Sequence, residues 1–243
     1  MATYVLIGGA WIGGWAWQGV AQRLRRRGHD VYPATLTGLG ERAHLGGPEV
    51  DLQTFIADIV NLITYEDLTE VTLVGHSYSG IVVSGVADRV GERVSRLVFC
   101  DSAPFVDGEA YLDILPVDAQ SGLRQTVARK GDGWRVPFPS IEDLGAGASL
   151  RGLNGADLEL LQAKATPHPF ASYTQPLHLV GGAATPERAA IACDDMRKLV
   201  GFGIPRMVEM TKTPWRYVDI DTGHWPMLSA PDQLATVLHE LAG

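Results

Sequence analysis

The chain has 243 residues, a formal net charge of -8 at pH 7, and 46% hydrophobic residues. That length fits one large domain with a sizeable core, and the acidic balance argues against a nucleic-acid partner, which would favour a basic face. The apolar stretch 4–17 lacks a basic leader and is interrupted by glycines, so we expect no signal peptide, transmembrane segment or membrane partner.

Short apolar segments alternate with helical segments along the chain, in the order typical of a mainly parallel sheet with helices on both faces. We predict strands at 3–7, 31–36, 71–74, 97–100, 189–193 and 216–220. We predict helices at 15–27, 52–64, 81–90 and 232–241. The fold class is therefore α/β. Helices 52–64 and 232–241 are candidates for a homodimer face, although a core position explains their apolar residues more simply.

The regular alternation breaks down between 104 and 186 into short helical patterns rich in Pro and Gly. A structureless loop of that length is implausible in a compact domain. We predict a small cap over the carboxyl ends of the strands, where ligands of open α/β sheets bind. The core would then have two parts, 1–103 and 187–243, with the cap at 104–186 inserted between them.

The most informative stretch is 71–80, which reads Val-Thr-Leu-Val-Gly-His-Ser-Tyr-Ser-Gly. A β-branched strand that stops at Gly75 and leads to a serine among small residues is the pattern of a nucleophile elbow. We expect Ser77 at the tip of a strained turn, with the amide of Tyr78 aimed at a bound carbonyl oxygen. Ser79 stands where glycine is usual, which is a mild departure because serine is also small.

A serine nucleophile needs a base, and the stretch 219–227 supplies one after the last predicted strand. His224 lies in this loop, where the base belongs in the chain order serine, acid, histidine. The other histidines are weaker candidates. His76 adjoins Ser77 but is expected to point away from it, because neighbouring residues of a strand face opposite sides.

The acid that orients the imidazole has two competing positions. Asp101 ends the strand that follows the elbow helix, so its side chain is expected at the same sheet edge as Ser77. Asp194 and Asp195 end the next core strand, beyond the cap, and are also compatible with reaching the histidine loop. The residue pattern alone leaves both positions open.

These motifs resemble those of the α/β-hydrolases, close to the branch that holds plant methyl-ester esterases, hydroxynitrile lyases and their bacterial esterase-like relatives. The resemblance covers nearly the whole chain and rests on the first loop at 5–15, the stretch 35–42, the elbow, and Thr222-Gly223-His224. In the first loop, Gly8 stands where the relatives usually have histidine.

The resemblance implies an oxyanion hole made of the amides of Ala10 and Tyr78, and it places Trp11 in the acyl pocket. Aromatic residues near the expected site indicate an apolar or aromatic substrate. The predicted pocket residues are Trp11, Trp134, Phe138 and Trp225. Phe170 is a further candidate for the inner face of the cap, although these aromatic side chains would serve equally well to hold the cap together.

The resemblance also bears on the acid. The plant enzymes place it after the strand 189–193, at a position that aligns with Met196, so Asp194 and Asp195 are slightly out of register. Bacterial relatives carry an aspartate at the position of Asp101. We therefore predict Asp101 as the acid, with Asp194 or Asp195 as the alternative.

The predicted function is that of a serine hydrolase that cleaves carboxylic esters of small, apolar or aromatic substrates through an acyl-enzyme. The same fold also supports hydroxynitrile-lyase-like cleavage, lactone or thioester hydrolysis, a cyclisation, or a small-ligand receptor. Hydroxynitrile lyases of this branch use a pocket lysine. Lys198 and Lys212 do not obviously occupy that position, which favours hydrolysis.

Neither a metal nor a cofactor is expected. The chain has no His-Glu-x-x-His or Cys-x-x-Cys spacing, which would indicate a metal site. The glycines at 8–13 loosely match a dinucleotide fingerprint, but the strand 31–36 lacks the terminal acid that would hold a ribose. Cys100 and Cys193 each end an apolar run, and we expect them to be reduced and the protein to be cytoplasmic.

Overall fold

The fold is built on a parallel sheet, seen in a computed structural model that describes residues 1–181 and 186–242. The strand order is β2-β1-β3-β4-β7-β8, and every neighbouring pair is parallel. The strands are β1 Thr3–Ile7, β2 Asp30–Ala34, β3 Val71–His76, β4 Val94–Cys100, β7 Glu187–Ala192 and β8 Arg216–Asp219. The predicted α/β class is confirmed, and each predicted strand is present.

The strand ends differ from the predictions by a few residues. β3 continues to His76 instead of stopping at Gly75, because it lies between β1 and β4 and His76 still pairs with Cys100. β2 stops at Ala34, short of the predicted end at residue 36. It lies at the edge of the sheet and contains Pro33, which has no amide to donate and is tolerated at an edge.

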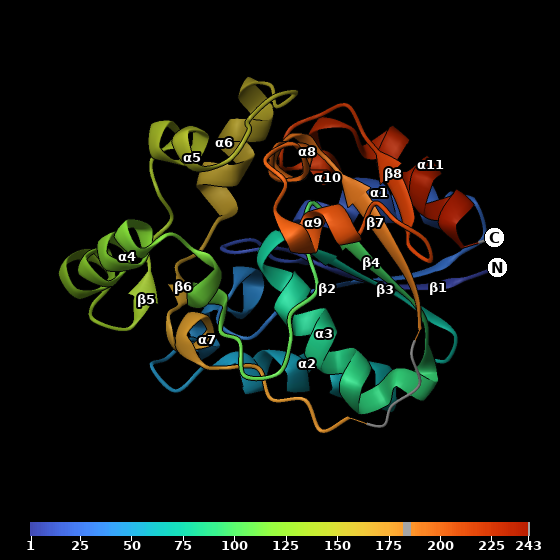
Figure 1. Cartoon of the computed structure of the whole chain (residues 1–243), viewed down its shortest axis with the longest axis horizontal. Coiled ribbons are helices and arrows are strands. Elements are labelled where there is room, and N and C mark those ends of the chain that lie inside the picture. Colours follow the sequence, from blue (N-terminus) through green and yellow to red (C-terminus); the bar gives the residue numbers. More distant parts are fainter. Residues whose placement is uncertain (182–185, 243) are drawn as a thin grey trace.

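Helices cover both faces of the sheet (Figure 1). The helices of the core are η1 Gly14–Trp17, η2 Gly40–Leu45, η3 Ser77–Ser79, η4 Gly91–Arg93, α1 Gln18–Arg26, α2 Leu52–Tyr65, α3 Gly80–Val90, α8 Asp194–Gly201, α9 Pro205–Glu209, α10 Pro226–Ser229 and α11 Pro231–Leu241. The predicted helix 15–27 is thus divided between the 3₁₀ helix η1 and α1.

Two apolar layers lie on either side of the sheet. In β1, Tyr4 and Leu6 pack with residues of α1 and α11, whereas Val5 and Ile7 pack with residues of α2 and α3. This alternation follows from the period of two along a strand, and burial on both faces explains why central strands are apolar throughout. Most of the apolar residues of α2 and α11 are buried within the chain, so they belong to the core, whereas Tyr65 at the end of α2 is exposed. Dimerisation stays a prediction.

The segment between β4 and β7 forms a layer of short elements. They are η5 Tyr111–Ile114, α4 Val117–Lys130, β5 Arg135–Val136, α5 Ile141–Gly147, α6 Gly155–Lys164, β6 His168–Pro169 and α7 Ala171–Thr174. Figure 1 shows α4, α5 and α6 beyond the edge toward which the strands run. Residues 182–185 of the predicted cap lie outside the described residues, and the division of the chain at 103 and 186 stays a prediction.

The end of this cap segment is fastened to the core. The side-chain oxygen of Gln175 accepts the amide of Gln53 at 2.9 Å, and its nitrogen donates to Asp51 at 2.7 Å. Asp51 also caps α2 by accepting the amide of Thr54, which satisfies a donor at the helix start. Among the described residues, no helix is long and apolar enough to cross a membrane.

Candidate active site

Ser77 lies on a sharp turn between β3 and α3. Its φ is 51°, a left-handed conformation whose cost for a non-glycine residue is on the order of 1–3 kcal/mol. A Cβ at Gly75 would lie 2.8 Å from the carbonyl oxygen of Ser79, and one at Gly80 would collide with Ser102. Packing therefore holds the turn, and the serine side chain projects from it.

Ser79 takes the position where glycine is usual without disturbing the turn. Its side chain is fully buried, and its hydroxyl donates to the carbonyl of Gly8 in the first loop. The elbow is thereby joined directly to the loop after β1. A second hydroxyl, that of Ser102, donates to the carbonyl of Ser77 itself. Sequence reasoning did not identify Ser102.

His224 lies in the loop between β8 and α10, and its ring faces Ser77. The amides of Gly223 and His224 donate to the carbonyls of Arg151 and Ser149, at 2.9 and 2.8 Å. Residues 149–151 belong to the cap segment, so the cap helps to hold the histidine loop. His224 Nε2 lies 2.8 Å from Ser77 Oγ, within hydrogen-bond reach.

Asp101 completes a chain of hydrogen bonds with the histidine and the serine. It follows β4, its side chain is fully buried, and its Oδ2 lies 2.6 Å from His224 Nδ1. Its Oδ1 accepts the amides of Cys193 and Met196, each at 3.0 Å. The carboxylate is thus fixed at both oxygens, which orients the imidazole with its proton on Nδ1 and leaves Nε2 as an acceptor for the serine proton.

The two alternative aspartates differ sharply in position. Asp195, in the first turn of α8, has its Oδ2 at 3.2 Å from His224 Nδ1, so two carboxylates face one ring nitrogen. Asp194 instead forms ion pairs with Arg151 and Arg197, which hold the pKa of its carboxyl far below the ordinary value. The structure therefore brings Asp101 and Asp195 to the histidine, but not Asp194.

The charge of His224 depends on these carboxylates. Burial lowers its pKa, but the hydrogen bonds to Asp101 and Asp195, together with their negative charges, raise it to about 9. Asp101, Asp195 and His224 each place one potential metal-ligand atom within 4.8 Å of the others. Those atoms also form the contacts between the imidazole and its carboxylates.

His76 lines the cavity and contacts the histidine of the site. Its Nε2 donates to the carbonyl of His224 at 2.7 Å, and the two rings lie 4.8 Å apart. Burial, with the nearby His224, keeps the pKa of His76 well below its ordinary value, so it is a neutral donor. The contact arises because the His224 loop passes over this end of β3, where it meets the residue before Ser77. That the His76 side chain points away from Ser77 stays a prediction.

The first loop passes directly beside the nucleophile. A Cβ at Gly9 would lie 2.8 Å from the Cβ of Ser77, so only glycine permits this approach. Among the described residues, the Ala10 amide has no hydrogen-bond acceptor. Tyr78 is the second residue of η3, and amides in the first turn of a helix lack partners within the helix. The two amides predicted for an oxyanion hole thus belong to the residue after Gly9, which approaches Ser77, and to the residue after Ser77 itself.

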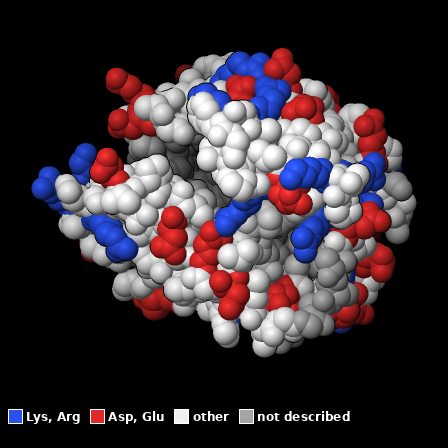
Figure 2. All heavy atoms as spheres, in the orientation of Figure 1, with Lys and Arg blue, Asp and Glu red and all other residues white. Residues whose placement is uncertain are grey.

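A cavity of about 990 Å³ opens over Ser77 and His224, between the core and the cap. Figure 2 shows the molecule hollowed between these parts, with mostly uncharged side chains around the hollow. Of the predicted pocket residues, Trp11, Phe138 and Trp225 line this cavity. Trp134 does not. Its ring lies under the guanidinium of Arg135, 5.3 Å away, and Phe170 also lies outside the lining.

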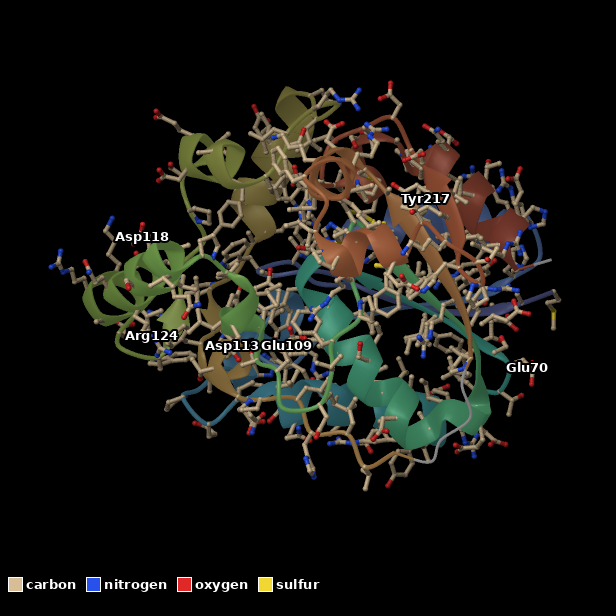
Figure 3. The ribbon with its side chains drawn as sticks, viewed as in Figure 1. Glu70, Glu109, Asp113, Asp118, Arg124 and Tyr217 are labelled. Atoms are coloured by element: carbon tan, nitrogen blue, oxygen red, sulfur yellow. The ribbon has the colours of Figure 1, made fainter. Side chains whose placement is uncertain are left out.

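Sequence reasoning missed the wall formed by α4 and the turn before it. Leu115, Ala119 and Leu123 line the cavity at intervals of four residues, a spacing that places side chains on one face of a helix. Figure 3 shows Asp118 above this helix and Arg124 below it, where the Arg124 guanidinium lies over the Phe170 ring, 5.8 Å from its centroid. The spacing of four residues was the signal in the sequence that could have predicted this helix face. It was missed because the surrounding segment has few other apolar residues.

Comparisons with known proteins agree with this architecture. Residues 4–237 match the alpha/beta hydrolase family. The chain is 34% identical to a carbendazim hydrolyzing esterase from Nocardioides sp. (strain SG-4G), over 99% of this chain and all of that one. It is 26% identical to methylesterase 10 of Arabidopsis thaliana, over 98% of this chain and 91% of that one.

A solved structure shows the same fold. An extracellular alpha/beta-hydrolase from a Paenibacillus species superimposes with a TM-score of 0.84 at 22% identity, covering 99% of this chain and 98% of that one. The matched family spans nearly the whole chain, and the sheet, the elbow and the histidine loop have the arrangement that its fold requires. The chain belongs to the alpha/beta hydrolase family.

Proposed function

We propose that this protein is a serine esterase that hydrolyses small carboxylic esters with apolar or aromatic groups. The observation that carries the proposal is the continuous chain from Asp101 Oδ2 through the His224 ring to Ser77 Oγ, with contacts of 2.6 and 2.8 Å. A base oriented by an acid and in contact with a hydroxyl is the arrangement that activates serine. Relatives named as esterases support the same reaction.

The reaction proceeds in two halves. His224 Nε2 takes the proton of Ser77 as Oγ attacks the ester carbonyl, and the amides of Ala10 and Tyr78 stabilise the resulting oxyanion. The tetrahedral intermediate expels the alkoxide, which leaves as the alcohol with the proton from His224. A water molecule, deprotonated by His224, then attacks the acyl-enzyme and releases the acid while Ser77 regains its proton.

The positions of the lysines favour hydrolysis over hydroxynitrile-lyase-like cleavage. Neither Lys198 nor Lys212 lines the cavity. Lys130 does line it, but as an exposed residue at the C-terminal end of α4. The proposal is tested with p-nitrophenyl esters of increasing acyl length, with carbendazim included because of the relative that hydrolyses it. Turnover supports an esterase, and its absence on every ester would contradict this.

The α4 wall is expected to limit the size of the acyl group. Replacing Ala119 with tryptophan fills part of the cavity, so kcat/KM for octanoate should fall more than about 10-fold while that for acetate changes less than about 3-fold, since lost pocket contacts cost about 1–3 kcal/mol. Ser121→Trp is the matched control, because Ser121 is exposed on the same helix and does not line the cavity. Equal losses on both esters would contradict the assignment of this wall.

Activity is expected to rise with pH up to the pKa of His224, about 9. Only the neutral imidazole can accept the Ser77 proton, so kcat/KM should fall about tenfold per pH unit below that value and level off above it. The rate is measured from about pH 6 to 10, with Ser77→Ala as the blank for spontaneous hydrolysis. A flat profile across this range would contradict the role of His224 as the base.

A cytoplasmic location is part of the proposal. Cys100 and Cys193 are both buried and form no disulfide, which suits a reducing compartment. Cell fractionation of the source organism, with an antibody against the chain, tests this directly.

A further inference from the structure

Trp11 is held by the cap at each of its polar groups. Its amide donates to Nδ1 of His168 at 3.3 Å, its carbonyl accepts the amide of Thr166 at 2.9 Å, and its indole donates to the carbonyl of Val136 at 3.1 Å. The φ of Trp11 is 65°, a left-handed conformation that persists only where surrounding contacts impose it. Trp11 directly follows Ala10, so these contacts also fix where the Ala10 amide points.

The first loop lacks a side chain of its own for this task. A Cβ at Gly8 would lie 2.9 Å from Ile12 Cγ1 and 3.0 Å from the Ile12 carbonyl oxygen, so the loop has no room for one. Gly9 is equally confined by Ser77 and His76. Support for the amide of Trp11 therefore comes from outside the loop, from the imidazole of His168 in β6.

The hydrogen bonds of His168 define its tautomer. The Ser172 hydroxyl donates to the carbonyl of Pro169 at 2.7 Å, so its oxygen is an acceptor for His168 Nε2, 3.0 Å away. The proton is thus on Nε2, and Nδ1 is left with a lone pair for the Trp11 amide. Burial lowers the pKa of His168 to about 3, which keeps the ring neutral.

Ser172 also contacts Tyr78, the residue that follows the nucleophile. Its carbonyl accepts the hydroxyl of Tyr78 at 3.0 Å, and both side chains are buried. One residue of α7 therefore supports the two oxyanion donors. It holds Tyr78 through the phenol, and it holds the loop of Ala10 through His168 and Trp11.

We propose that His168 is a positioning residue for the oxyanion hole, acting through Ser172 on one side and the Trp11 amide on the other. His168 itself does not touch the substrate, and it does not line the cavity. Its contribution is to present the Ala10 amide at the place where charge develops, which lowers the barrier without changing substrate affinity. The proposal rests on the esterase function proposed above.

Two substitutions of His168 test the hydrogen bond from its Nδ1 to the Trp11 amide. His168→Asn places a side-chain oxygen close to the former Nδ1 and keeps an acceptor for Trp11, whereas His168→Leu removes it. We expect His168→Leu to lower kcat about 100-fold, the scale of a displaced catalytic group, with KM changed less than about 3-fold. His168→Asn should restore kcat to within about 5-fold of wild type. Inhibition by an aryl trifluoromethyl ketone, which forms an oxyanion on the enzyme, should weaken in parallel with kcat.

Phe55→Leu is the control for packing. Phe55 is buried edge-on against the rings of His168 and Tyr78, with 5.4 and 6.1 Å between centroids, and it has no hydrogen bond to either ring or to the first loop. The Phe55→Leu substitution should lower the Tm of the protein without lowering kcat. A fall in kcat for His168→Leu no larger than that for Phe55→Leu, or a fall expressed only in KM, would overturn the proposal.

A third variant covers the case in which His168→Leu does not fold. His168→Gln carries its amide near the former Nε2, so the proposal requires kcat of His168→Asn to exceed that of His168→Gln at least about 10-fold, and equal values would overturn it. Turnover by the wild type is measured first. If wild type hydrolyses no ester, the proposed function fails, whereas activity that is insensitive to His168 defeats only this inference.

Discussion

Ser77→Ala is expected to lower kcat for ester hydrolysis by about 10⁴-fold or more. The substitution removes the atom that bonds to the acyl group, so neither half of the reaction can proceed through an acyl-enzyme. Residual activity above the rate in water would come from the oxyanion donors and from binding, which do not depend on the serine hydroxyl. The measurement is steady-state hydrolysis of p-nitrophenyl acetate, with the fold checked by circular dichroism.

Ser84→Ala is the matched control for this loss. Ser84 lies on α3, seven residues beyond the nucleophile, and its hydroxyl bonds only structural groups, the carbonyl of Gly80 and the amide of Phe105. We expect a lower Tm and an unchanged kcat. Retention of activity by a folded Ser77→Ala protein would exclude the acyl-enzyme mechanism.

Asp101→Asn is expected to have the second largest effect. An amide in this position presents either a donor to His224 Nδ1 or a neutral oxygen, so the imidazole loses both its fixed tautomer and the charge that stabilises its cation. Loss of a sole acid costs about 10⁴-fold in kcat. Here Asp195 lies 3.2 Å from the same nitrogen, so we expect a smaller loss, about 10²- to 10³-fold. The readout is kcat on the same ester.

Asp195→Asn isolates the second carboxylate. Its effect on kcat at high pH should be below about 10-fold, because Asp101 remains bonded to the ring at 2.6 Å. Removal of its negative charge should also lower the pKa of His224 and move the rising limb of the pH profile to lower pH. The double variant should approach the full loss of about 10⁴-fold. A larger loss for Asp195→Asn than for Asp101→Asn would reassign the acid.

The parts of the site that depend on local sequence patterns could be predicted from the sequence. The elbow could be predicted because a buried strand, a serine and small neighbours lie within ten consecutive residues, 71–80. His224 could be predicted because its loop directly follows the last strand. The parallel sheet followed from alternating apolar segments, since strands buried on both faces are apolar throughout.

Other features depend on contacts between distant residues. Whether Asp101 or Asp195 faces His224 is decided by side-chain direction at two neighbouring strand ends, and in fact both do. The His168 contact joins residues 157 positions apart, which no local pattern reveals. Trp134 was expected in the pocket because tryptophan suits an apolar wall, but the same property lets it pack beside Arg135 instead.

Covalent capture of the nucleophile tests the central claim most directly. Wild-type protein is treated with a fluorophosphonate, and the modified residue is located by mass spectrometry of its peptides while ester hydrolysis is followed in the same sample. The account predicts one phosphonyl adduct, on Ser77, and a loss of activity in proportion to its formation. Ester turnover that persists in fully labelled protein, or an adduct on another residue that accompanies the loss, would contradict it.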